Sequence, residues 1–351
     1  MNRANNLKKS AFLLLSVVLL NSSFVSASER NVSALNLRGD MLNRKESISY
    51  SMNRENIEYV TGLSSDVIPY MDEAFSYPDN DGTCGDYLAF SVREASVSGS
   101  YSSDGKGKLN YKFTYMTTYE QEAELSALAS SVSSQIEGKS DFEKAKYIHD
   151  YICEHANYDT SYSKFDAYNL LFNHSAVCEG YALGFYRLAK AAKLDCRIVT
   201  GKASGDRVVN GSIQEGNQST GDNHAWNIVK IDGQWYNVDV TWDDQNKISY
   251  DYFLKNEADF SPEGATHERN AKYADINVAQ VSVDMNNPPS GSTPYENQEI
   301  TDQTSENEAA NSADKSKIEN KDKSSNIFET IGKTIAKVVN SVIEFINSIF
   351  N

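Results

Sequence analysis

The chain has 351 residues, of which 40% are hydrophobic and 23% are charged, as in ordinary globular proteins. This length suits two structured domains whose cores need no disulfide bonds. The net charge of −16 at pH 7 excludes the basic surface with which proteins neutralise phosphates. We therefore expect no nucleic-acid partner.

Residues 1–27 have the three regions of a secretory signal peptide. Arg3, Lys8 and Lys9 make a basic start, residues 11–20 are an apolar run, and residues 25–27 are small as at a cleavage site. The apolar run is well under the ~20 residues that a membrane-spanning helix needs. We expect a protein that is secreted or associated with the cell surface.

Residues 28–128 predict a small α+β region with one β-hairpin. The pattern of residues 66–75 fits a helix, whereas residues 87–92 and 109–115 are rich in strand-forming residues and alternate. Between these two strand signals, Asp104-Gly105 is a hairpin turn signal. No activity can be assigned to this region.

A helix is predicted to begin after Ser140 and to run to about Ala156. Ser140 and Glu143 form the capping box that opens such helices. His149 and Cys153 lie on this helix, and we interpret both as core residues, a satisfied thiol and a half-buried imidazole.

Cys178 is the first candidate for chemistry. It opens a predicted helix in which Tyr181, Phe185 and Leu188 recur at helical spacing. The first turn of a helix has unpaired N–H groups and the positive end of the helix dipole, which favour the nucleophilic thiolate. If Cys178 stood alone, a buried packing role would be the better interpretation.

A predicted hairpin places a histidine and an aspartate on one face. Residues 223–230 and 234–242 alternate as strands around the turn Asp232-Gly233. With a two-residue loop, His224 and Asp239 occupy diagonal positions with Cα atoms roughly 7–8 Å apart. The imidazole and the carboxylate can therefore meet.

Together, Cys178, His224 and Asp239 supply a nucleophile, a general base and a group that orients the base. One ring nitrogen of His224 would face the thiol while Asp239 holds the other. The backbone N–H of Cys178 is a candidate oxyanion donor, and the second donor stays open. We also expect the long loop of residues 205–221 to flank the active cleft.

The segment from about 140 to 280 resembles the transglutaminase-like superfamily, in particular its secreted bacterial branch. Three motifs carry the resemblance: Val177-Cys178-Glu179-Gly180, Asn223-His224-Ala225-Trp226 and Asn237-Val238-Asp239-Val240-Thr241-Trp242. The resemblance implies a catalytic domain over residues 129–285 with an α+β, papain-like fold, in which a Cys-bearing helix packs on an antiparallel sheet. It also assigns the triad to Cys178, His224 and Asp239.

The resemblance implies acyl transfer through a thioester on a protein or peptide substrate. Glutamine crosslinking and deamidation differ only in whether an amine or water reaches the thioester. Because the superfamily also contains peptidases, amidases and members without the nucleophile, two alternatives stay open. They are a cell-surface cysteine peptidase or peptidoglycan amidase, and a non-catalytic surface binding or assembly module.

We predict no cofactor and no metal site. The loop of residues 79–82 spaces its oxygen ligands as calcium loops do, but it lacks the acidic residue that closes them, which favours a turn. No C-x-x-C pair indicates zinc. Three cysteines remain besides Cys178: Cys84, Cys153 and Cys196. Because three is an odd number, at least one thiol is unpaired or bridges two molecules. A packing role is favoured for Cys196.

Two segments follow residue 285. Residues 286–325 hold three of the six prolines and one aromatic residue, a composition that predicts a disordered linker. Residues 326–351 place their apolar side chains mostly on one half of a helical wheel, which predicts an amphipathic helix. Polar residues at every turn argue against a membrane span. Docking on the folded domains, self-association and membrane-surface contact stay open for this helix.

Overall fold

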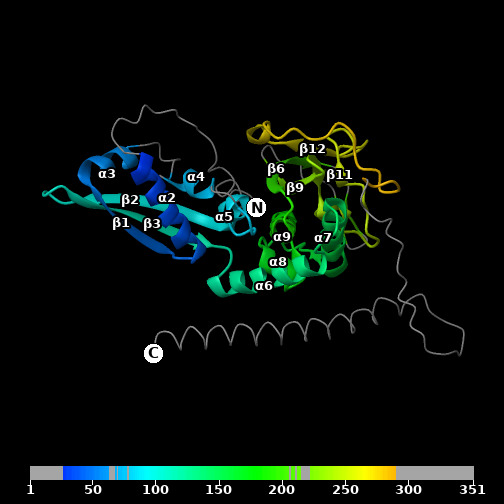
Figure 1. Ribbon diagram of the computed structural model, residues 1–351, viewed down its shortest axis with the longest axis horizontal. Helices are drawn as coiled ribbons and strands as arrows, with labels where there is room; N and C mark the ends of the chain where they lie inside the picture. Colours follow the sequence, from blue (N-terminus) through cyan, green and yellow to red (C-terminus); the bar gives the residue numbers. More distant parts are fainter. Residues whose placement is uncertain are drawn as a thin grey trace, which may run out of the picture. The chain divides into compact units, whose positions relative to one another are not determined.

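The computed structural model describes residues 27–62, 68, 70–76, 79–204, 207–209, 212–214 and 222–289 (Figure 1). The predicted signal peptide up to residue 26, most of the loop of residues 205–221, the linker beyond Pro289 and the amphipathic helix lie outside these residues. Within the described ranges, no helix has the length and apolar character needed to cross a membrane. All of the described residues belong to one compact unit.

The N-terminal region is built on a three-stranded antiparallel sheet in the order β1-β3-β2. Its core contains Leu37 and Met41 of the first helix together with Leu109, Tyr111 and Phe113 of the central strand. Its elements are α2 (Ala27–Leu42), β1 (Ser47–Asn53), α3 (Arg54–Thr61), α4 (Met71–Phe75), α5 (Gly85–Ser91), β2 (Val92–Tyr101) and β3 (Lys106–Tyr115).

The hairpin predicted in this region is present, because β2 and β3 pair up to Tyr101 and Gly107 around the expected turn. The strand predicted over residues 87–92 is wrong, since residues 85–91 form α5 and the strand begins at Val92. The inward side chains of α5, Tyr87, Leu88 and Ser91, follow helical spacing. The Tyr87 hydroxyl donates to Glu122 at 2.8 Å, a long-range contact that the local pattern could not indicate. Of the helix predicted over residues 66–75, only residues 71–75 are found in α4, since Ile68 and Tyr70 are described but not helical and Tyr70 has a φ of +66°.

The second part of the fold has a five-stranded antiparallel sheet in the order β11-β10-β9-β6-β12. Its helices are α6 (Tyr119–Gln135), α7 (Asp141–His155), α8 (Ala167–Leu171), α9 (Cys178–Ala191), α10 (Val240–Asp243) and the 3₁₀ turn η1 (Ala271–Tyr273). Its strands are β4 (Asn157–Tyr158), β5 (Ser175–Ala176), β6 (Cys196–Ser204), β7 (Arg207–Val209), β8 (Ser212–Gln214), β9 (His224–Ile231), β10 (Gln234–Val238), β11 (Phe253–Lys255) and β12 (Thr266–Arg269). The α+β class predicted from the sequence is confirmed, and the capping box at Ser140 opens α7 as expected.

Helix α9 lies against β6 and β9, between the sheet and helices α6, α7 and α8 (Figure 1). Its side chains Tyr181, Phe185 and Leu188 are buried in the largest core cluster. A Cβ on Gly184 would lie 2.4 Å from the Leu170 side chain, so glycine permits the close approach of α8. Asn227 of β9 donates to the Ala182 carbonyl at 3.1 Å, which joins the helix to the sheet. The predicted Cys-bearing helix on an antiparallel sheet is therefore present.

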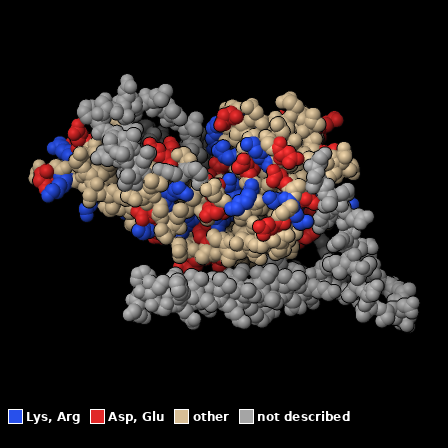
Figure 2. All heavy atoms as spheres, viewed as in Figure 1, with Lys and Arg blue, Asp and Glu red and all other residues tan. Residues whose placement is uncertain are grey.

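Polar contacts join the N-terminal region to this second part. Arg197 of β6 pairs with Asp86 of α5 at 2.7 Å, and the Tyr186 hydroxyl of α9 donates to Asp79 at 2.9 Å. On the face seen in Figure 2, basic and acidic side chains of the described residues are interspersed. Helix α5 is thus tied to the sheet at β6, and the loop that precedes α5 is tied to the Cys-bearing helix.

Alanine at position 201 should destabilise the fold. Gly201 lies on β6, where a Cβ would be 2.2 Å from the Glu268 carbonyl of β12 and 2.7 Å from the Trp226 ring. Because one of these neighbours is backbone, we expect Gly201→Ala to lower the free energy of unfolding by about 1–3 kcal/mol. Gly39→Ala in α2 is the matched control: nothing lies within 4 Å, and alanine should add about 0.5–1 kcal/mol. Urea unfolding measures both, and equal effects would contradict the close packing of β6 and β12.

Candidate active site

Cys178 is the first residue of α9, as the sequence predicts. The preceding Val177 is extended, with φ −87° and ψ 177°, and offers no side-chain cap. No side chain at the cap position therefore accepts from the N–H groups of the first turn. Cys178 is half-buried, whereas the other three cysteines are buried.

The predicted hairpin register is confirmed, since Gln234 faces Ile231 and Val238 faces Asn227. The second strand was predicted to continue to residue 242, and this is wrong: β10 ends at Val238. Asp239 caps α10 instead, and its Oδ1 accepts the backbone N–H groups of Thr241 at 3.0 Å and Trp242 at 3.2 Å. The chain therefore turns at Asp239, and this turn fixes the carboxylate.

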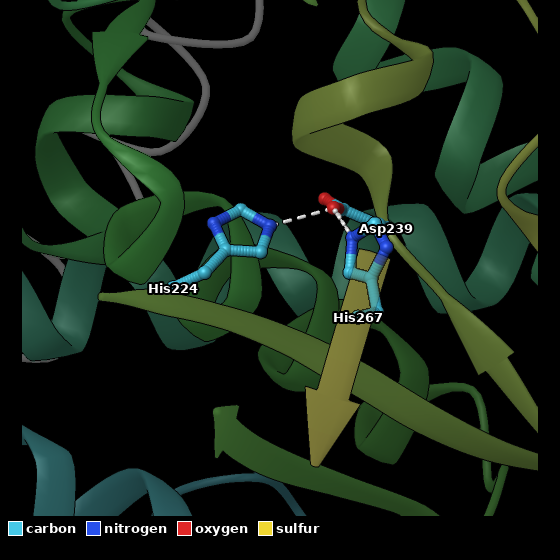
Figure 3. Close-up of side chains that lie close together, drawn as sticks. All are labelled: His224, Asp239 and His267. Atoms are coloured by element: carbon cyan, nitrogen blue, oxygen red, sulfur yellow. Dashed lines mark hydrogen bonds and ion pairs between the residues drawn. The ribbon is translucent and has the colours of Figure 1, made fainter. Parts of the chain in front are cut away.

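His224 lies between Cys178 and Asp239. Its Nε2 is 2.6 Å from Asp239 Oδ2 (Figure 3), and its side chain also hydrogen-bonds with Cys178. Since Nε2 contacts the carboxylate, Nδ1 is the ring nitrogen that is left for Cys178. The structure thus brings together all three of the residues that the sequence singles out.

His224 and Asp239 each stabilise the charged form of the other. Burial would lower the pKa of His224, but the Asp239 carboxylate and Cys178 outweigh burial and raise it to about 10. Burial would raise the pKa of Asp239, yet the interactions with His224 and His267 hold it well below its ordinary value. At neutral pH the site accordingly contains an imidazolium and a carboxylate, and the imidazolium can stabilise a thiolate beside it.

His267 of β12 is a member of this cluster that sequence reasoning missed. Its Nε2 is 3.0 Å from Asp239 Oδ2, the oxygen that His224 also contacts (Figure 3). His267 lies 28 residues beyond Asp239 and outside the three motifs. No helical or strand periodicity connects the two residues along the chain. Only the pairing of β12 with β6 brings His267 to the site.

Two further contacts hold α10 in place. His149 Nε2 is 3.1 Å from Asp243 Oδ2, and its Nδ1 is 2.9 Å from Asp150 Oδ1. The Tyr181 hydroxyl, one turn beyond Cys178 on α9, donates to Asp244. The turn that carries Asp239 is therefore tied to α7 and to the Cys-bearing helix. His149 is fully buried rather than half-buried as predicted.

Loss of His149 should weaken the fold in a pH-dependent manner. Burial would lower the pKa of His149, but hydrogen bonds to Asp150 and Asp243 raise it above its ordinary value. Its stabilising effect is therefore complete below the unfolded-state pKa of about 6.5 and is lost as pH rises through the higher folded-state pKa. We expect His149→Gln to cost on the order of 3 kcal/mol at about pH 6, and less as pH rises.

Urea unfolding of the wild type and His149→Gln at several pH values between about 6 and 9 checks this expectation. Burial raises the pKa of Asp243 and its contact with His149 opposes this effect, so Asp243→Asn is made in both proteins to remove this second titration from the comparison. A gap that widens with pH would contradict the imidazolium state of His149.

All four cysteines lie among the described residues, and none forms a disulfide bond. Cys153 and Cys196 are buried, as predicted, and burial raises the pKa of both thiols. Cys84 is also buried, and its sulfur accepts a hydrogen bond from Arg38 Nη2 at 2.9 Å. Cys178 is thus the most accessible of the four sulfurs.

Two clusters of metal-ligand type occur among the described residues: His224 with Asp239 and His267, and Asp79 with Asp81 and Cys84. Two histidines and a carboxylate are a ligand set that suits zinc. In the first cluster, however, Nε2 of His224 and Nε2 of His267 each lie within hydrogen-bond distance of Asp239 Oδ2, as in a hydrogen-bonded network. In the loop of residues 79–82, Asp79 Oδ1 accepts the N–H of Gly82 at 2.8 Å, and Gly82 has a φ of +81°, as in a tight turn.

Part of this chain is similar to known proteins. Residues 127–240 match the model of the transglutaminase-like superfamily, which confirms the resemblance inferred from the motifs. Kyphoscoliosis peptidase from Mus musculus is 33% identical over 113 residues, and the Homo sapiens protein is 32% identical over 113 residues. Each match covers 30% of this chain but only 16% of the relative. The chain therefore corresponds to about a sixth of these relatives.

Solved structures with similarity to this chain include a candidate cysteine protease from Cytophaga hutchinsonii, with a TM-score of 0.27 and 15% identity over 43% of this chain and 65% of the other. A second is described as a TGase, with a TM-score of 0.25 and 17% identity over 54% of this chain and 50% of the other. Such distant likenesses assign no role to any residue.

Proposed function

Because residues 127–240 form a transglutaminase-like superfamily domain, we propose that this protein is a cysteine enzyme that transfers the acyl group of a protein or peptide carboxamide through a thioester. One observation carries the proposal. Both ring nitrogens of His224 are engaged, one by Cys178 and the other by the buried Asp239. A scaffold without activity has no physical need for this arrangement.

The proposed reaction begins with attack of the Cys178 thiolate on the carboxamide carbon. The His224 imidazolium gives its proton to the departing nitrogen, the carbon–nitrogen bond breaks, and a thioester with Cys178 remains. Asp239 stabilises the imidazolium and holds the ring in place. The N–H of Cys178 at the start of α9 donates to the oxyanion.

The thioester is then opened by an amine or by water. His224, now neutral, takes a proton from this nucleophile, and the thiolate of Cys178 leaves. With a glutamine substrate the first product is ammonia, and the second is a crosslinked amide or a glutamate. Water exclusion around the thioester decides between these outcomes.

A cysteine peptidase is the second candidate. The curated relatives are called peptidases, and their match includes 30% of this chain. The same three residues would cleave a backbone amide by the same steps, with a peptide amine in place of ammonia as the leaving group.

One experiment separates these possibilities. The purified chain is incubated with a library of glutamine-containing peptides and a labelled primary amine, with Cys178→Ala in parallel. Amine incorporation identifies a transferase, conversion of glutamine to glutamate a deamidase, and chain cleavage a peptidase. If neither protein yields a product, while vesicles or further copies of the chain bind, the proposal fails and the binding-module alternative replaces it.

We also propose that the protein is exported and loses residues 1–27. The basic start, apolar run and small residues support this proposal. N-terminal sequencing of the protein released by its host should begin at Ser28, and retention of the first 27 residues would contradict export by this route.

A further inference from the structure

His224 and His267 share one oxygen of Asp239. Nε2 of His224 is 2.6 Å from Asp239 Oδ2, and Nε2 of His267 is 3.0 Å from the same atom, so the two rings approach the carboxylate from different sides (Figure 3). All three side chains are buried, with exposed fractions of 7% for His224, 1% for Asp239 and 6% for His267. Water therefore does not compete for this oxygen.

The chemistry of a carboxylate determines where the protons lie. An ionised carboxylate oxygen only accepts hydrogen bonds, so each histidine must donate from Nε2. The two ring centroids are 5.6 Å apart, and two buried imidazolium ions at this distance would repel each other. Burial lowers the pKa of His267, although Asp239 opposes this effect, whereas the pKa of His224 is raised. His267 is accordingly the neutral ring and His224 the charged one.

Hydrogen bonds to both oxygens fix the Asp239 carboxylate. Its Oδ1 accepts two backbone N–H groups, from Thr241 and Trp242, and its Oδ2 accepts from the two histidines. Four hydrogen bonds fill the acceptor sites of a carboxylate. If the His267 donor were lost, Oδ2 would be held by His224 alone.

Aromatic rings hold His267 itself in position. Its ring centroid is 4.2 Å from that of Phe260, 4.4 Å from that of Trp242 and 5.3 Å from that of Tyr252. Its backbone N–H donates to Ser261 Oγ at 2.9 Å. A neutral imidazole enclosed by rings is a rigid donor with little freedom to change rotamer.

From this arrangement, and on the premise of the proposed function, we propose that His267 is a positioning residue: it fixes the Asp239 carboxylate and takes a share of its charge, so that His224 can still release its proton to the leaving group. His267 lies beyond residues 127–240, so the site extends past the matched domain. The other titratable groups that act on this cluster are Cys178 on His224, and Asp243 and Tyr252 on Asp239.

Two substitutions test the proposal. His267→Phe keeps a ring in the aromatic enclosure but removes the donor, whereas His267→Gln keeps an N–H donor at about the same reach. We expect His267→Phe to lower kcat about 10–100-fold with little change in KM, a size typical of partners that orient a functional side chain. His267→Gln should recover most of this loss. An unchanged kcat in His267→Phe, or an equal loss in both variants, overturns the proposal.

A second measurement requires no substrate. Nitrogen-15 NMR of the five histidines distinguishes neutral rings from imidazolium ions and shows which nitrogen carries the proton. In the wild type, His267 should be neutral with its proton on Nε2 at pH 7. In His267→Phe, the full charge of Asp239 acts on His224. The pH at which His224 is half deprotonated should therefore rise by roughly half a unit or more.

A charged His267 at neutral pH, or no shift of His224, contradicts the proposal even if no substrate is ever found. If instead the wild type turns over no substrate while the NMR results are as expected, the proposed function fails and the hydrogen-bond arrangement stands. The two failures can therefore be told apart. Urea unfolding of both variants establishes that each is folded.

Discussion

Replacing Cys178 with alanine should lower acyl transfer by a factor of about 10⁴ or more, because no other group can form the thioester. Cys178→Ser should be nearly as inactive. A serine hydroxyl stays protonated beside an imidazolium, whereas the site stabilises an ionised sulfur next to His224. Release of ammonia and incorporation of a labelled amine both measure the loss.

Cys196→Ala is the matched control for this prediction. Cys196 is a buried cysteine at the start of β6, outside the triad, so its replacement should leave turnover unchanged. Alkylation with iodoacetamide, followed by mass spectrometry of the peptides, should modify Cys178 first in the wild type. Substantial turnover by Cys178→Ala would show that another residue is the nucleophile.

Asp239→Asn should be the second most damaging change, with a loss on the order of 10³–10⁴ in kcat/KM. The amide keeps the size of the side chain but removes the charge that offsets burial of His224. We therefore expect the pKa of His224 to fall well below about 10, although Cys178 still raises it, so that less of the imidazolium needed to protonate the leaving group is present.

The pH profile provides the decisive measurement for Asp239→Asn. In the wild type, the alkaline limb of kcat/KM should report loss of the His224 proton near pH 10. In Asp239→Asn, this limb should move to the acidic side by several units. A lower rate with an unmoved alkaline limb would mean that Asp239 holds the turn at α10 but does not set the charge of His224.

The features predicted well from sequence were local. The capping box of Ser140 and Glu143, the helix start at Cys178 and the hairpin register at Asp232-Gly233 are each confirmed. Each depends on contacts within a few residues or on the two-residue period of a strand. This information was sufficient to predict that His224 and Asp239 meet, although Asp239 follows the hairpin and caps α10.

The errors occurred where long-range packing overrode a local pattern. Residues 87–92 were predicted to be a strand, but residues 85–91 form α5, which packs against the core through Tyr87 and Leu88. Tertiary contacts often override β-propensity in such short segments. The early end of β10 at Val238 has a similar origin, because Asp239 accepts the N–H groups of the next turn and Asp243 binds His149 of α7.

By itself, the sequence determined the residue types of the triad, the elements that carry Cys178 and His224 and the register of the hairpin that precedes Asp239, since these follow from backbone periodicity and capping. Only the tertiary structure decided that His224 lies between Cys178 and Asp239, that His267 shares the same carboxylate, and that His149 and Tyr181 anchor the turn beside it. These contacts join residues up to 94 positions apart. They arise when buried surfaces pack, and no local pattern along the chain encodes which distant side chains will meet.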